Sequence, residues 1–243
     1  MSDKNIKNKN ENNEKEKMNE NINNESKKKR DESNEGGKPK LNFYQKVDKF
    51  GDLVFLNLMF VVSCIPVITI GAAVTAMYAY LFKMVDDEED SLWKGYWGYF
   101  KSNFKPATKA WGVLIIIFGI MFGEFYASLA MTGTSALFMT ALIGIEAVFL
   151  SFILPLLFPL IARYENTTFN YFKNSFLISI SNLGTWFYLF FIWFIPILIY
   201  ATTTKILVYS WYLWLLIYIS LFAYASSYQL KKLFKKIEET VEK

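Results

Sequence analysis

The chain has 243 residues, of which 53% are hydrophobic and 19% aromatic, and its formal net charge is +4. A soluble domain of this size cannot bury so much apolar surface, so these proportions exclude a soluble globular protein. The chain has no His and one cysteine, Cys64, which excludes a disulfide framework and a thiolate metal site. It also lacks the usual proton shuttle, and we expect no metal, no cofactor and no enzymatic activity.

Residues 1–41 consist mainly of Asn, Lys, Glu and Ser. Such a segment cannot bury enough apolar surface to offset the entropy of ordering, so it is predicted to be a disordered cytoplasmic tail. The basic run Lys27–Arg30 is followed at once by Asp31 and Glu32. This pattern indicates a solvated charge run, and no nucleic-acid partner is expected.

The stretch Leu53–Phe82 contains no charged residue until it ends. As one helix it would be about 45 Å long, against about 30 Å for the hydrocarbon core of a bilayer. Pro66 lacks an amide hydrogen and Gly71 tolerates unusual backbone angles, so the chain is predicted to break at Pro66, Thr69 and Gly71. We expect a hairpin of two short helices, about 51–66 and 70–85. One long tilted helix is the alternative.

Four further apolar segments are each long enough to span a bilayer, at about 107–131, 135–162, 177–201 and 206–228. The predicted fold is therefore an all-α polytopic membrane helical bundle over residues 42–230, with about six crossings. Residues 231–243 are rich in Lys and Glu and are predicted to form a basic cytoplasmic tail.

Half of the 26 Lys and Arg residues precede Leu53, and the 83–109 connection is also basic. Positive charge stays on the cytoplasmic side of a membrane. If both segments are cytoplasmic, the first apolar stretch enters and leaves on one side, and the later connections alternate. We therefore expect a multi-pass protein of the cell membrane with both termini in the cytoplasm.

Two carboxylates, Glu124 and Glu146, lie inside apolar segments. Ionisable groups within a membrane are expensive, so each is a candidate intramembrane polar site. Each could instead be protonated or hydrogen-bonded to a hydroxyl group. A second feature, Gly112, Gly119, Gly123 and Ala127, forms a stripe of small residues that predicts close helix packing.

The connection between residues 91 and 105 has the pattern of an amphipathic helix lying in the membrane interface. The aromatic residues lie on one face and are Trp93, Tyr96, Trp97, Phe100 and Phe104. The basic residues lie on another face and are Lys94, Lys101 and Lys105. Residues 168–176 offer a second such surface. These helices either dock a partner with their lysines or anchor the bundle at the interface.

Five segments, in order and with plausible spacing over residues 43–230, resemble the YesL-like family of bacterial membrane proteins. They are Gly51-Asp-Leu-Val-Phe-Leu-Asn57, Pro66-Val-Ile-Thr-Ile-Gly71, Phe100-Lys-Ser-Asn-Phe104, Phe158-Pro-Leu-Ile-Ala-Arg-Tyr-Glu-Asn166 and Lys173-Asn174. The family has no established activity and no known active site. The resemblance implies an association with sugar-uptake systems of Gram-positive bacteria.

Two functions are therefore considered. The first is a non-enzymatic accessory or permease-like component of carbohydrate uptake, whose partners are the lipid bilayer and sugar-transport subunits. The alternative is a stand-alone small proton-linked transporter that uses Glu146. A water-lined cavity at Glu146 would favour the transporter, whereas a closed bundle with exposed cytoplasmic helices would favour the accessory component.

Overall fold

A computed structural model describes residues 47–88, 91–202 and 214–241 of the chain. The chain divides into two units, residues 1–51 and 52–243. Of the first unit the structure describes residues 47–51, which are helical. The tail predicted for residues 1–41 lies outside the described residues.

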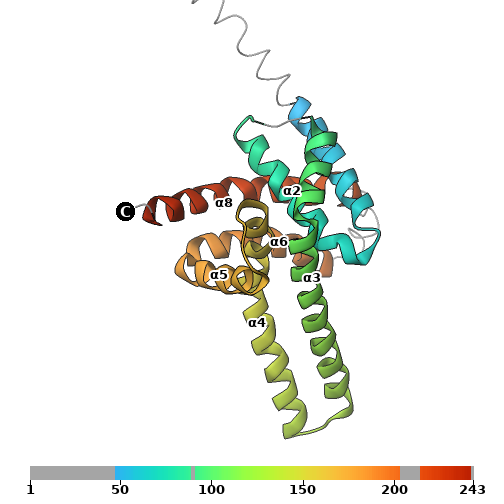
Figure 1. Ribbon diagram of the computed structural model, residues 1–243. Helices are drawn as coiled ribbons and strands as arrows, with labels where there is room; N and C mark the ends of the chain where they lie inside the picture. The colour runs from blue at the N-terminus through green and yellow to red at the C-terminus, as the bar shows by residue number, and fades with distance from the viewer. Residues whose placement is uncertain (1–46, 89–90, 203–213, 242–243) are drawn as a thin grey trace, which may run out of the picture. The chain divides into compact units, whose positions relative to one another are not determined.

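The second unit begins with a helix that ends at residue 63, and the chain then bends before the 3-10 turn η1 (Val67–Thr69) and helix α2 (Ile70–Val85). The helix and α2 run in opposite directions (Figure 1). The Thr69 hydroxyl lies 2.6 Å from the carbonyl oxygen of Ser63 and 2.7 Å from that of Pro66, and so stabilises the turn. The predicted break between Pro66 and Gly71 is confirmed, and the single long helix is wrong.

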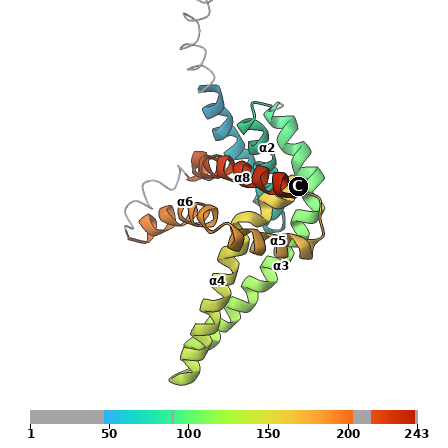
Figure 2. The ribbon, with the colours of Figure 1, turned by 90° about the vertical axis from the view of Figure 1, so that its left-hand side faces the viewer.

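Helices α3 (Leu92–Ala130) and α4 (Thr134–Arg163) are joined by a turn in which Gly133 has a φ of +67°. Their far halves form a two-helix hairpin (Figures 1 and 2). The separate interfacial helix predicted for residues 91–105 is wrong, because α3 continues through Pro106. A proline removes one backbone hydrogen bond, and the burial of Tyr96 before it and Ala107 after it holds both sides in one helix.

The segment predicted as a span at about 177–201 is not one continuous helix. Helices α5 (Thr168–Ser181) and α6 (Leu183–Thr202) meet at a bend of 105°. Asn182 leaves the helical conformation, with φ −133° and ψ 57°, and its side-chain amide donates to the Ile178 carbonyl oxygen. Its own carbonyl oxygen accepts from the amides of Thr185 and Trp186, which begins α6 in the new direction.

A short π-helix (η2, Trp214–Tyr218) leads into α8 (Ile219–Val241). The predicted span 206–228 lies partly outside the described residues. The predicted tail from residue 231 is wrong, since its described residues 231–241 belong to α8. The reason is a buried apolar face, Leu230, Leu233 and Phe234, at helical spacing. The ring of Phe234 packs edge-on against Phe82 of α2 at 5.9 Å.

Every regular element in the part of the chain that the structure describes is helical. Three helices, Val67–Val85, Leu92–Ala130 and Thr134–Arg163, are long and apolar enough to cross a membrane, and the bent α5–α6 pair could form a fourth. These helices suggest a membrane protein. Both views show α6 and α8 lying across the α3–α4 hairpin (Figures 1 and 2). The expected six crossings and the sidedness remain predictions.

Candidate functional site

The structure brings together the two candidate carboxyl groups, Glu124 of α3 and Glu146 of α4. Their side chains lie within hydrogen-bonding reach of each other, and we call them the carboxyl pair. The Oε2 atom of each is buried and accepts no hydrogen bond from a described residue. The sequence singled out both residues, but it gave no sign that they face each other, because the turn at residues 131–133 sets the register between the helices.

The carboxyl pair can bind a proton between its two groups. Two ionised carboxylates are both acceptors, so they repel each other and cannot form a hydrogen bond. Once one is protonated it can donate a hydrogen bond to the other. Among the described residues there is no group of three or more His, Cys, Asp or Glu side chains that could hold a metal ion.

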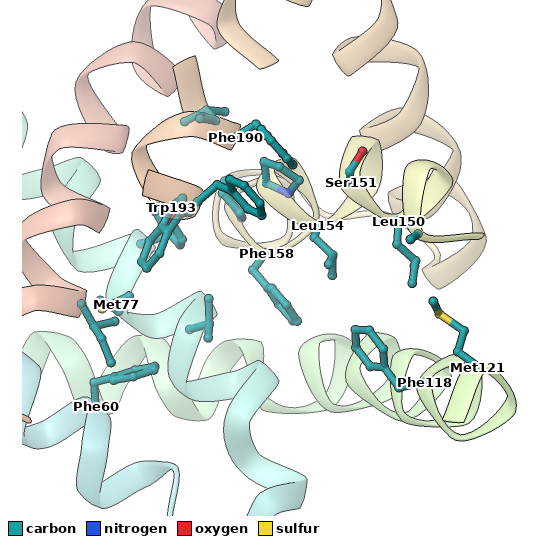
Figure 3. A pocket seen from close by; sticks show the side chains of 18 residues that line it. Phe60, Met77, Phe118, Met121, Leu150, Ser151, Leu154, Phe158, Phe190 and Trp193 are labelled. Atoms are coloured by element: carbon teal, nitrogen blue, oxygen red, sulfur yellow. The ribbon is translucent and has the colours of Figure 1, made fainter. Parts of the chain in front are cut away.

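An apolar cavity of about 640 Å³ lies one helical turn from the carboxyl pair. Met121 of α3 and Leu150 of α4 face each other at one end of this cavity (Figure 3). Glu124 follows Met121 by three residues and Glu146 precedes Leu150 by four, which places the pair in the next layer between the helices. The lining includes Phe60, Met77, Phe118, Leu154, Phe158, Phe190 and Trp193, so the cavity is not water-lined.

The start of α3 exposes a surface that contains most of the residues predicted for docking or anchoring. Trp93, Lys94, Gly98 and Lys101 are exposed, and Trp97 is half-buried beside them. These five residues line a surface hollow, which we call the α3 hollow. A Cβ atom on Gly98 would have nothing within 4 Å, so this position faces open space.

The other three aromatic residues predicted for this helix have different surroundings. Tyr96 is fully buried in the core, so it does not face lipid as expected. Phe100 is half-buried and stacks against Tyr96, with 6.3 Å between the ring centroids. Phe104 is exposed. The aromatic stripe therefore joins the helix to the bundle at its middle and leaves its ends accessible.

Gly71 is the residue of the predicted break with the tightest surroundings. A Cβ atom on Gly71 would lie 2.6 Å from the Cβ of Trp111 and 2.7 Å from the carbonyl oxygen of Ala107. The Trp111 indole N–H donates to the Val67 carbonyl oxygen at 2.7 Å. Gly71 therefore allows α2 to approach α3, and Trp111 satisfies the backbone of η1.

The glycine stripe predicted to pack a helix does not pack against any described residue. A Cβ atom on Gly112, Gly119 or Gly123 would have nothing within 4 Å. These glycines lie on open faces of α3. The prediction of close packing is wrong for them, because α4 contacts α3 on the side that carries Glu124.

Sequence reasoning missed a polar contact between the first helix and α8. The Asn57 side-chain oxygen accepts from the Ser220 amide at 2.9 Å, and the Ser220 hydroxyl donates to the Leu53 carbonyl oxygen at 2.7 Å. Asn57 and Ser220 are both fully buried. The π-helix η2 ends at Tyr218, and Ser220 is the second residue of α8. A lone Asn among apolar residues was the available signal.

A second missed contact joins the end of α4 to α8. Arg163 donates two hydrogen bonds to the carboxylate of Glu238, at 3.0 and 3.1 Å, and the Tyr164 hydroxyl donates a third at 2.7 Å. The hydrogen bonds from Arg163, and then from Tyr164, hold the pKa of Glu238 below its ordinary value. A bidentate pair of this kind fixes direction as well as distance.

The chain was compared with known protein families, curated proteins and solved structures. Residues 53–125 match the family model described as "Protein of unknown function, DUF624". The match covers the break, α2 and α3 almost to its end, including both Gly71 and the α3 hollow. No curated protein and no solved structure matched the chain.

Proposed function

We propose that this protein is a non-enzymatic accessory component of carbohydrate uptake in the cell membrane, and that it docks an acidic surface of a sugar-transport subunit in its α3 hollow. The resemblance to the YesL-like family supports the link with carbohydrate uptake, since YesL-like proteins carry DUF624 domains. The DUF624 match includes the residues of the hollow. Positive charge around the hollow supports a cytoplasmic position for it.

The observation that carries this proposal is the composition of the α3 hollow. It combines two tryptophans, Trp93 and Trp97, with two exposed lysines, Lys94 and Lys101. Tryptophan contributes strongly to binding energy at protein interfaces when it is desolvated by a partner. Lysines at the rim attract and orient an acidic partner. Anchoring in the interface would use the same tryptophans but would not need the lysines to face one hollow.

The test is co-purification in mild detergent from cells that express the sugar-transport systems. We expect Lys94→Glu with Lys101→Glu to abolish recovery of sugar-transport subunits, identified by mass spectrometry, while the thermal unfolding midpoint stays unchanged. The matched control is Lys105→Glu with Lys109→Glu, because both lysines are exposed on α3 but lie outside the hollow. Equal recovery with both double variants would contradict docking, and a loss of membrane insertion would assign the helix an anchoring role.

The carboxyl pair favours a second candidate, the proton-linked transporter. The observation that supports a transporter is that Glu124 lies beside Glu146, so the site can hold a proton between two groups. The apolar lining of the neighbouring cavity offers few partners for the hydroxyls of a sugar, which is why we place this candidate second. Reconstituted vesicles with a pH gradient test it directly. Sugar-dependent proton entry that disappears in Glu146→Gln would support transport, and no such entry in the natural protein would contradict it.

A further inference from the structure

We propose that the apolar cavity binds one alkyl chain of a membrane lipid. This inference is independent of the proposed docking function. It rests on the chemistry of the lining, on the way the cavity opens, and on the satisfaction of the polar groups of Ser151 in its wall.

The lining is aliphatic and aromatic along its whole length. Phe118, Phe158, Phe190 and Trp193 present rings to it, and Met77 lies at its inner end (Figure 3). None of the described residues that line it is charged. Its volume of about 640 Å³ falls within the range of about 300–1,000 Å³ typical of ligand sites. A long unbranched alkyl chain has the matching chemistry.

The hydroxyl and carbonyl groups of Ser151, in the wall of the cavity, are already hydrogen-bonded. The Ser151 hydroxyl donates to the Val148 carbonyl oxygen at 2.6 Å. The Ser151 carbonyl oxygen accepts from the Trp186 indole at 2.8 Å. A sugar entering this cavity would lose its bonds to water without replacement, whereas an alkyl chain loses none.

The cavity opens between α3, α4 and α6. At the rim, Phe118, Ala147 and Phe194 are exposed. At the floor, Met77 and Leu189 are each only 1% exposed. Since α3 and α4 are candidate membrane spans, this opening faces the surface that the spans present to lipid, and an acyl chain can enter from the side.

An empty cavity would leave the floor residues without contacts on one side. Water does not fill it, because a buried water needs two to four polar partners. Packing against the rings would gain dispersion energy, and this energy, rather than the hydrophobic effect, drives association inside a bilayer. A lipid chain is the one apolar occupant always present there.

The experiment uses the full chain in phospholipid nanodiscs that contain a phospholipid with a diazirine near the end of one acyl chain. After irradiation, mass spectrometry locates the adducts. We expect adducts on the peptides that carry Met77 and Leu189, which lipid around the outside of the protein cannot reach. A parallel sample with a diazirine fatty acid separates two sources of the same chain. Labelling by the phospholipid assigns the chain to a bilayer lipid, and labelling by the fatty acid alone assigns it to a free acid.

Adjacent residues of α4 provide a matched pair of variants. Ala147→Phe narrows the rim and should reduce the floor adducts several-fold, whereas Val148→Phe, at an exposed position outside the lining, should leave them unchanged. Phe118→Ala widens the rim, so the adducts on Met77 and Leu189 should stay the same or increase. This variant provides a second test if Ala147→Phe fails to fold. Adducts confined to exposed residues such as Ile116, or floor adducts that Ala147→Phe leaves unchanged, would overturn the proposal.

Discussion

Two regions of the same helices differ sharply in how they are covered. In the packed region, α2 lies against the first part of α3, the last part of α4, and α8. Of the most apolar 18-residue stretch of Val67–Val85, 67% is buried. In the far hairpin, residues 115–149 of α3 and α4, the helices are just as apolar but largely exposed. None of residues 115–149 is classed as buried.

The difference shows that apolar sequence alone does not specify helix packing in a membrane. Lipid is as apolar as leucine, so helices associate through close fit and polar contacts instead. The packed region has both, in Gly71 against Trp111 and in Asn57 with Ser220. The far hairpin has the carboxyl pair between its helices and open glycines on another side.

The largest expected effect comes from adding one methyl group to a glycine in each region. Gly71→Ala should lower the free energy of unfolding by about 3 kcal/mol, the upper part of the usual range for overpacking, because the new atom meets backbone and Cβ atoms that cannot rotate away. Gly119→Ala should be neutral or stabilising by about 0.5–1 kcal/mol, because it removes a flexible residue from a helix without a contact. Thermal unfolding in detergent measures both.

Equal stability of Gly71→Ala and the natural protein would contradict the close approach of α2 and α3. A large loss in Gly119→Ala would show that its face is covered by something other than this chain.

The second prediction concerns the polar contact in the packed region. Asn57→Ala should lower the free energy of unfolding by about 1–3 kcal/mol, because the buried Ser220 amide loses its acceptor. Thr140→Ala, in the far hairpin, removes an exposed hydroxyl that bonds its own helix at Ala136 and should change stability by less than about 0.5 kcal/mol. Denaturation of the two variants under the same conditions measures both changes in stability. A similar loss of stability in both variants would contradict the difference between the two regions.

The sequence predicted local events better than contacts between distant segments. The break at Pro66–Gly71 was predictable because both residues act on their own backbone. The continuity of α3 through Pro106 was not, because the burial of Tyr96 decides it. The bend at Asn182 was missed since its apolar neighbours on both sides suggested one span.

The candidate site shows the same limit. Glu124 and Glu146 were identified as unusual from their apolar surroundings. Their pairing depends on the turn between α3 and α4, and the partners of Glu238 lie more than seventy residues away in the chain. Neither relation has a periodic signal that a single sequence could reveal.

A smaller effect is expected where the packed region ends, at Arg163 and Glu238. The pKa of Glu238 is lower in the folded state than its ordinary value, so its ion pair adds stability above about pH 4.3 and loses it as the pH falls through the lowered pKa. Glu238→Gln should remove this pH dependence. The expected difference is below about 1 kcal/mol, because the Glu238 side chain is 40% exposed. Unfolding measured from pH 7 to pH 3 tests it, and identical pH profiles would contradict the ion pair's contribution.

The smallest effect on stability is expected at the carboxyl pair. In Glu146→Gln the amide can donate to Glu124, as a protonated carboxyl would, so the unfolding midpoint should change little. Loss of folded protein in this variant would show that an ionised Glu146 has a structural partner, and would make the far hairpin more like the packed region than we infer.

The side of the membrane that each region faces matters most for the proposed docking function. The proposed docking function needs the α3 hollow to be cytoplasmic, and the hairpin turn at residues 131–133 to be outside. Single cysteines at Ser91 and Thr134, on a Cys64→Ser background, can be treated with an impermeant thiol reagent on intact cells. We expect labelling at Thr134 on intact cells and at Ser91 only after permeabilisation. Labelling at Ser91 on intact cells would contradict the cytoplasmic docking surface directly.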